Sequence, residues 1–265
     1  MTIHPSAIVD PGAELGASVT VGPYAIIEKG VVIGDGTEVG AHAVISGSAT
    51  IGKRNSIHSF ASIGAPPQDL KYNGEETELV IGDDNQIREY VSIHRGTVTG
   101  RGVTTVGNSN MIMAYCHIAH DCIVGNHVIM ANGGTLGGHV SVGDHVNLGG
   151  MVAIHQFSRV GAHSYIGGMS GISKDVPPFV IASGIRDYLR ITGINKIGLR
   201  RSGYAAEDIA ALAKAFVSIF RTELVLSEAL DIVLAEFSEC RLVVELVTFM
   251  KAPNRFGVVR KFDAE

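Results

Sequence analysis

An aliphatic residue recurs at every sixth position along most of this 265-residue chain. The repeat starts at Ile3, is interrupted twice and ends at Ile172. A helix requires a period near 3.6 and a strand a period of 2, so neither explains the pattern. A period of six fits a chain that turns a corner after each hexapeptide, with the aliphatic residue inside. The sequence therefore predicts a mainly β fold, a left-handed parallel β-helix of three-sided coils in which residues 18 apart stack.

Two polar segments interrupt the repeat, and the last part of the chain lacks it. The interruptions, residues 64–80 and 94–105, contain proline or glycine and are expected to be loops expelled from the scaffold. Residues 1–186 are therefore assigned to the β-helix and 187–265 to a small C-terminal α-helical domain.

Apolar residues three and four positions apart predict helices in that last part of the chain. We expect one helix over 206–221 and another over 227–237, with Ser227 as its N-cap. A third is expected over 240–250. These helices are placed at the open end of the coil or beside it.

Composition limits the class of protein. The net charge of −5 argues against nucleic-acid binding, and no apolar run is long enough for stable insertion in a membrane. No signal peptide is recognised, and the three cysteines lack metal-type spacing, which favours reduced thiols and a cytoplasmic location. Charged residues make up only 18% and the mean hydropathy is +0.25, which suits an oligomer with covered surface.

The densest group of polar residues lies around Ile118, an inward position. His117 and His120 flank it and should point outward near a corner, and Asp121 lies one coil below His139 by the 18-residue rule. Imidazoles beside a carboxylate suit general-base chemistry, although a corner histidine is more often merely solvated. A second column, His127 with the residues 18 and 36 further on, is too closely stacked to favour a metal.

Six sequence strings carry a resemblance to a known family. They are QDLKY at 68–72, IHRGT at 93–97, HIAHDC at 117–122, GGHVSVGD at 137–144, IHQF at 154–157 and DVPPFVIASG at 175–184. Their order and content resemble the UDP-N-acetylglucosamine O-acyltransferases that begin lipid A biosynthesis, and the resemblance covers essentially the whole chain. It implies transfer of a 3-hydroxyacyl chain from acyl carrier protein to the sugar 3-hydroxyl, in a homotrimer with sites between adjacent prisms. No metal and no tightly bound cofactor is implied.

The resemblance also implies a role for each site residue. His120 is the expected general base, Asp121 its orienting partner, and the Gly138 N–H the expected donor to the oxyanion. Substrate contacts are expected from several further residues, namely Gln68, Asp69, Leu70, Lys71, His117, His139, Gly150, Gln156, Asn195 and Arg201. Gly168 lies where the family measures acyl length, and its missing side chain predicts a preference for longer 3-hydroxyacyl chains.

Three other functions remain open from the residues alone. An amine acceptor, such as a 3-amino UDP-sugar or UDP-3-O-acylglucosamine, requires the same base and thioester donor. A zinc carbonic anhydrase on this type of prism requires three converging imidazoles, to which His117 and His120 would contribute. A non-catalytic β-helix scaffold requires no histidine at all.

Overall fold

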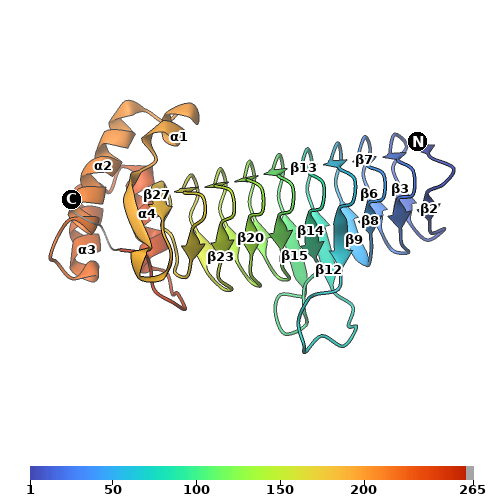
Figure 1. The fold of residues 1–265 in the computed structure, drawn as a ribbon. Helices are drawn as coiled ribbons and strands as arrows, with labels where there is room; N and C mark the ends of the chain where they lie inside the picture. The colour runs from blue at the N-terminus through green and yellow to red at the C-terminus, as the bar shows by residue number, and fades with distance from the viewer. Residues whose placement is uncertain (261–265) are drawn as a thin grey trace.

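The computed structural model describes residues 1–260 as a three-sided prism with helices at its C-terminal end (Figure 1). The hexapeptide strands fall into three sheets, one for each side of the prism. We refer to the 11-, 9- and 8-stranded sheets as faces A, B and C. The prediction of a left-handed parallel β-helix followed by helices is confirmed.

Most strands are only two residues long, because the chain turns after each hexapeptide. Face A contains β1 (Thr2–Ile3), β4 (Thr20–Val21), β7 (Glu38–Val39), β10 (Ser56–Ile57), β13 (Gln86–Ile87), β16 (Met111–Ile112), β19 (Ile129–Met130), β22 (Asn147–Leu148), β25 (Tyr165–Ile166), β27 (Val180–Ser183) and β28 (Arg190–Ile194). Face B contains β2 (Ile8–Val9), β5 (Ile26–Ile27), β8 (Val44–Ile45), β11 (Ser62–Ala65), β14 (Ser92–His94), β17 (His117–Ile118), β20 (Thr135–Leu136), β23 (Ala153–Ile154) and β26 (Gly171–Ile172). Face C contains β3 (Glu14–Leu15), β6 (Val32–Ile33), β9 (Ser48–Ile51), β12 (Glu78–Ile81), β15 (Val103–Val106), β18 (Ile123–Val124), β21 (Ser141–Val142) and β24 (Arg159–Val160).

The register follows the predicted 18-residue rule except across the two loops and at the last parallel pair, where Tyr165 pairs with Ile181, 16 residues further on. Thr2 pairs with Thr20, as the rule requires. Ser56 pairs instead with Gln86, and Gln86 with Met111, because each of these coils contains an inserted loop. The strands before and after each loop still pair in parallel. Both loops leave the prism at the corner between faces B and C, and they project side by side below it in Figure 1.

The predicted inward residues form the core, except at the N-terminal end. From Val21 onward they are buried, but Ile3 is 38% exposed because no coil precedes it. At the corners the chain passes through the left-handed backbone region, often at a residue other than glycine. Asp121, His139 and His145 have φ values of 60°, 63° and 57°. Such a residue turns its side chain outward, so the corners carry the ring and carboxylate side chains.

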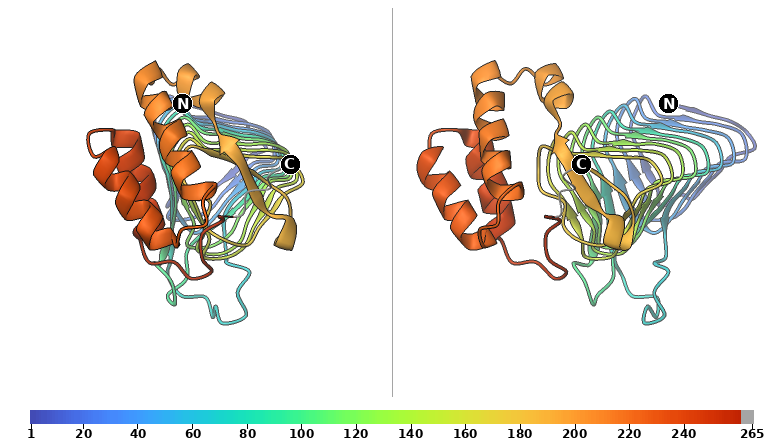
Figure 2. Two further views of the ribbon diagram at one scale, coloured as in Figure 1. Left: turned by 90° about the vertical axis from the view of Figure 1, so that its left-hand side faces the viewer. Right: turned by 60° about the vertical axis from the view of Figure 1, so that its left-hand side comes forward.

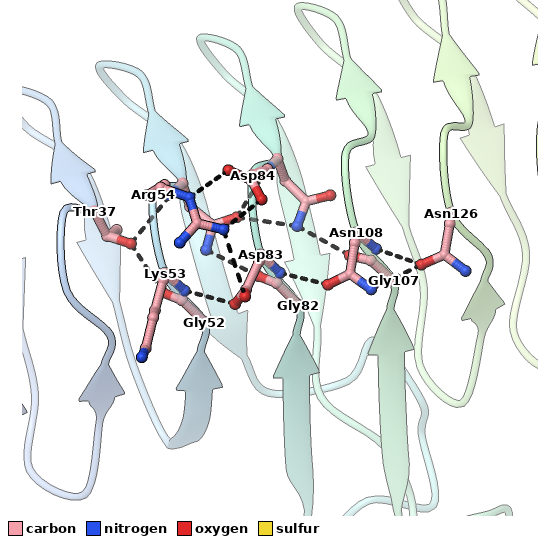
Figure 3. Close-up of polar contacts among 12 residues, drawn as sticks. Thr37, Gly52, Lys53, Arg54, Gly82, Asp83, Asp84, Gly107, Asn108 and Asn126 are labelled. Carbon is pink, nitrogen blue, oxygen red and sulfur yellow. Dashed lines mark hydrogen bonds and ion pairs between the residues drawn. The ribbon is translucent and has the colours of Figure 1, made fainter.

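The corner between faces C and A is held by two ladders of polar side chains. The outer ladder passes from the Asp83 carboxylate to Asn108 and Asn126 through hydrogen bonds to backbone N–H groups (Figure 3). The inner ladder is buried, and in it the Asn85 Nδ2 donates to Asn55 Oδ1 at 3.0 Å and to the Gly107 carbonyl at 2.9 Å. It links coils on both sides of the first loop.

The C-terminal part begins with a short 3-10 helix, η1 (Arg186–Tyr188), and a strand before the α-helices. Antiparallel pairing of β28 with β27 extends face A beyond residue 186, because Ile191 and Ile194 are apolar and close the end of the core. The helices then follow as α1 (Lys196–Arg201), α2 (Ala206–Phe220), α3 (Leu226–Glu236) and α4 (Arg241–Lys251). They stand beside the last coils in Figure 2.

The prediction of Ser227 as an N-cap is wrong. Helix α3 starts one residue earlier, with extended Val225 as its N-cap and no capping side chain. Residues 261–265, part of the predicted C-terminal domain, lie outside the described residues. Across residues 1–260, no helix is both long and apolar enough to cross a bilayer.

Candidate active site

The corner between faces B and C gathers most of the predicted site residues. His120, Gly138 and Gln156 follow one another at the predicted stacking interval and lie on successive coils, with Asp121 and His139 in the adjacent column. The turn at this corner carries Asp121 and His139 in the left-handed backbone conformation. The stacking rule therefore places the imidazoles and the carboxylate together, as predicted.

His120 and Asp121 form a hydrogen-bonded pair. The His120 Nδ1 lies 2.8 Å from Asp121 Oδ2, and the Asp121 side chain is fully buried whereas that of His120 is 15% exposed. Because an ionised carboxylate only accepts, this contact places the proton on Nδ1 and leaves the Nε2 lone pair free. The pair can therefore present a neutral imidazole as a base.

The second loop closes over the Asp121 carboxylate. Thr97 donates its hydroxyl to Oδ2 at 2.6 Å, and the Arg101 N–H donates to Oδ1 at 2.8 Å. Burial raises the pKa of the Asp121 carboxyl, but hydrogen bonds from the Thr97 and His120 side chains and from two backbone N–H groups outweigh it. The net shift is downward, so the carboxyl stays ionised without exposure to water. The sequence strings contained Thr97, but nothing in its spacing revealed this contact.

Gly138 lies against the His120 ring. A Cβ at Gly138 would be 2.6 Å from His120 Cε1 and 2.8 Å from Nε2, closer than any side chain allows. Within residues 1–260 the Gly138 N–H donates no hydrogen bond, while the Gly138 carbonyl accepts one from Phe157. An unpaired N–H on the backbone that lies against the His120 ring is the kind of donor that an oxyanion requires.

His139 lies edge-on to His120, with the ring centroids 5.1 Å apart. It stacks on Phe157 at 4.3 Å, and the Arg255 guanidinium covers the other side of Phe157 at 4.0 Å. Burial lowers the pKa of His139, against which the charges of Asp121 and Asp69 act. The C-terminal segment thus adds a cation near the corner, which the repeat pattern did not predict.

His117 points outward from face B beside the corner. Its Nδ1 lies 2.7 Å from the Ser92 hydroxyl, and its ring meets the ring of His94 edge-on at 4.9 Å. His94 is 6% exposed, and its Nδ1 has no hydrogen-bond partner among the described residues. Sequence reasoning did not assign His94 to the site, although it lies within the string IHRGT.

The first loop reaches the same corner. Asp69 raises the pKa of His139 by its charge, whereas the neighbouring Leu70 is completely exposed. Arg95 ties this loop to the second one, since its guanidinium donates to the Tyr72 hydroxyl at 2.8 Å and to the Gly64 carbonyl at 2.9 Å. Gln68 and Lys71 are exposed on the same turn.

The remaining predicted residues lie at the other two corners. Gly150 and Gly168 stack at the corner between faces A and B, where a Cβ on Gly168 would be 3.2 Å from the Gly150 carbonyl. Asn195 caps helix α1 and donates to the His163 carbonyl at the corner between faces C and A, and Arg201 ends that helix. One chain therefore does not bring these four residues to His120.

A metal centre is poorly supported at either histidine cluster. His120, Asp121 and His139 have ligand atoms within 4.8 Å of one another, but the Asp121 oxygens already accept hydrogen bonds from the second loop. The rings of His127, His145 and His163 stack 4.5–4.7 Å apart at 11–12°, so their in-plane lone pairs run side by side and do not converge.

Family models match both parts of the chain. Residues 175–259 match the family described as UDP-N-acetylglucosamine O-acyltransferase, domain 2. Residues 103–138 match the bacterial transferase hexapeptide family (six repeats), and residues 1–101 match the GMPPB C-terminal domain.

Relatives match nearly the full length. The acyl-[acyl-carrier-protein]–UDP-N-acetylglucosamine O-acyltransferase of Halorhodospira halophila is 51% identical, covering 97% of this chain and 99% of its own, and that of Burkholderia pseudomallei is 52% identical with the same coverage. The structure of the UDP-N-acetylglucosamine acyltransferase from Francisella novicida superposes with a TM-score of 0.94 at 38% identity, covering 98% of this chain and 94% of its own. The enzyme from Campylobacter jejuni gives 0.92 at 38% identity, covering 99% of this chain and all of its own. The chain therefore belongs to the UDP-N-acetylglucosamine O-acyltransferase family.

Proposed function

We propose that this acyltransferase moves a 3-hydroxyacyl chain from acyl carrier protein to the 3-hydroxyl of UDP-N-acetylglucosamine, with His120 as general base. The reaction, the first step of lipid A biosynthesis, comes from the full-length relatives at 51–52% identity. The role of His120 rests on one observation above all. Its Nδ1 is held by the buried Asp121 carboxylate at 2.8 Å, so the opposite nitrogen is available as a base.

The reaction transfers the acyl group from the thioester sulfur to the sugar oxygen, and one proton moves in the opposite direction. His120 Nε2 takes the proton from the sugar 3-hydroxyl while that oxygen forms a bond to the thioester carbonyl carbon. When the tetrahedral intermediate collapses, the carbon–sulfur bond breaks and the imidazolium returns the proton to the departing thiolate. The Asp121 carboxylate stabilises the imidazolium in between, and no redox step or cofactor is required.

The charge on the tetrahedral oxygen requires a donor close to His120. The Gly138 N–H has no hydrogen-bond partner within residues 1–260, and the Gly138 backbone lies against the His120 ring. A backbone donor fixed by the coil needs no rearrangement when the charge develops, which is the condition for electrostatic catalysis. We therefore assign the oxyanion contact to Gly138.

The groups around the His120–Asp121 pair would bind the substrate. His117 on the same coil, His139 on the next and Gln156 on the one after offer donors to the sugar, and Asp69 of the turn at 68–71 acts on His139. The pKa values of His117 and His139 are lowered, chiefly by burial, which favours neutral rings that both donate and accept.

A homotrimer with sites between prisms accounts for the residues left at other corners. A second copy would bring its own Asn195, Arg201, Gly150 and Gly168 to the site. Exposed apolar side chains support such packing: Leu70 is fully exposed, and five stacked rings line the corner between faces A and B. The free cysteines agree with a cytoplasmic location.

The test is acyl transfer from 3-hydroxyacyl carrier protein to UDP-N-acetylglucosamine by wild type and His120→Ala. We expect wild-type activity and a loss of about 100-fold or more in the variant, with the oligomer intact by sedimentation. His127→Ala is the matched control, an exposed histidine at another corner. Equal rates for wild type and His120→Ala would reject the proposed base. Transfer only to a 3-amino UDP-sugar would reject the hydroxyl acceptor.

A further inference from the structure

We propose that Thr97, on the second inserted loop, is a positioning residue for acyl transfer, because its hydroxyl fixes the carboxylate oxygen that orients His120. The inference rests on the proposed function of His120 as the base. It assigns the second loop to the His120–Asp121 pair, whereas the sequence indicated only a loop expelled from the scaffold.

Two groups share the same carboxylate oxygen. Asp121 Oδ2 accepts from the Thr97 hydroxyl at 2.6 Å and from His120 Nδ1 at 2.8 Å. The Thr97 backbone N–H also lies 3.1 Å from Oδ1 and 3.2 Å from Oδ2, so one residue contacts both oxygens. Hydrogen bonds to an ionised acceptor are the strong ones, and these set the direction in which the oxygen faces.

The loop is built to hold Thr97 in place. The Thr97 carbonyl accepts from the N–H groups of Gly100 and Gly102, and the Thr97 side chain is 2% exposed. Gly100 packs so closely on Asp121 that a Cβ there would be 2.4 Å from the carboxylate. This loop is the shorter of the two insertions, and its hydrogen bonds converge on Asp121.

A second imidazole, that of His139, competes with His120 for the Asp121 Oδ2 oxygen. His139 Nδ1 lies 3.8 Å from Asp121 Oδ2, so within residues 1–260 the carboxylate is close to two imidazoles, those of His120 and His139. Arg101 contributes only its backbone N–H to it. Without the Thr97 hydroxyl, Oδ2 is free to turn toward His139, and His120 loses the partner that keeps its proton on Nδ1. Thr97 thus selects His120 over its neighbour.

The test compares Thr97→Val, which keeps the shape, with Thr97→Ser, which keeps the hydroxyl. We expect Thr97→Val to lower kcat by about 10- to 100-fold, the size expected for one lost hydrogen bond to a charged group, with KM for the sugar unchanged. Thr97→Ser should stay within about 3-fold of wild type.

His120→Ala, measured alongside, separates this inference from the proposed function. Equal kcat for Thr97→Val and Thr97→Ser, with His120→Ala inactive, would overturn the role of Thr97 alone. A raised KM at constant kcat would also overturn it, since that indicates a substrate contact. Full activity of His120→Ala would reject the base itself. If Thr97→Val does not fold, Gly100→Ala tests the same contact: its Cβ must displace the carboxylate, so kcat should fall while KM stays constant.

Discussion

The α-carbon of Gly138 faces the imidazole of His120 with no room for a side chain between them. Gly138 lies one coil after His120, so the close approach is set by the rise of the prism from coil to coil. The backbone, not a side chain, therefore forms the wall beside the basic nitrogen. On the proposed mechanism, this fixed backbone also carries the N–H that would contact the oxyanion.

Gly138→Ala should disable catalysis without unfolding the protein. The new Cβ would lie 2.6 Å from His120 Cε1, so the ring must leave its contact with Asp121. We expect kcat to fall by about 100-fold or more, since misplacement by about 1 Å has that effect. Gly193→Ala is the control because a Cβ there meets nothing within 4 Å. Unchanged kcat in Gly138→Ala would mean that the backbone at residue 138 shifts without displacing His120.

His94→Gln should alter how stability depends on pH. Burial, aided by the charges of His117, His120 and Arg95, lowers the pKa of His94 from 6.5 to about 4. The unfolded chain binds this proton below pH 6.5 and the folded chain only near pH 4, so the wild type loses stability across that interval. Glutamine does not titrate, and it places no polar atom where the unpaired Nδ1 lies.

The measurement is Tm by differential scanning calorimetry at pH 8 and pH 4.5 for wild type and His94→Gln. We expect Tm to fall less in the variant than in the wild type when the pH is lowered from 8 to 4.5. The exposed His127, changed to Gln in the same way, is the control. Parallel Tm curves for wild type and His94→Gln would show that His94 takes up its proton equally in both states.

Asn85→Ala should destabilise the prism at the first loop. The change leaves the Gly107 carbonyl and the Asn110 N–H without their buried partners. Each such group costs roughly 1–3 kcal/mol. Asn108→Ala, on the exposed ladder of Figure 3, should cost much less because water replaces the side-chain partners Asp83 N–H and Asn126 Oδ1. Equal shifts in the urea midpoint for the two variants would contradict a special role for the buried ladder.

Gly168→Met should shift the acyl preference to shorter chains. Gly168 stacks on Gly150, where a Cβ would be 3.2 Å from the Gly150 carbonyl, and a methionine here would occupy the place expected for the acyl end. We expect kcat/KM to fall for long 3-hydroxyacyl donors and to be retained for short ones, which serve as the internal control. The same chain-length profile as the wild type would show that Gly168 does not bound the acyl site.

The sequence by itself determined the prism. A six-residue period has no other regular solution, so the inward residues, the 18-residue stacking and the meeting of His120, Asp121 and His139 at one corner followed from counting. The family resemblance then assigned chemistry to residues that the count had already placed together. Local patterns also predicted the later helices, although the start of helix α3 depended on extended Val225 and not on Ser227.

Only the tertiary structure decided what the inserted loops do. The period stops inside residues 94–105, so nothing in the sequence shows that Thr97 turns back onto Asp121 or that Arg95 binds Tyr72 of the other loop. The same holds for Arg255, which is far from Phe157 along the chain and packs on its ring. Such contacts depend on side-chain positions set by packing, which a repeat length does not encode. The coil places His120 and Asp121 at one corner, and the irregular segments fix how these side chains are held.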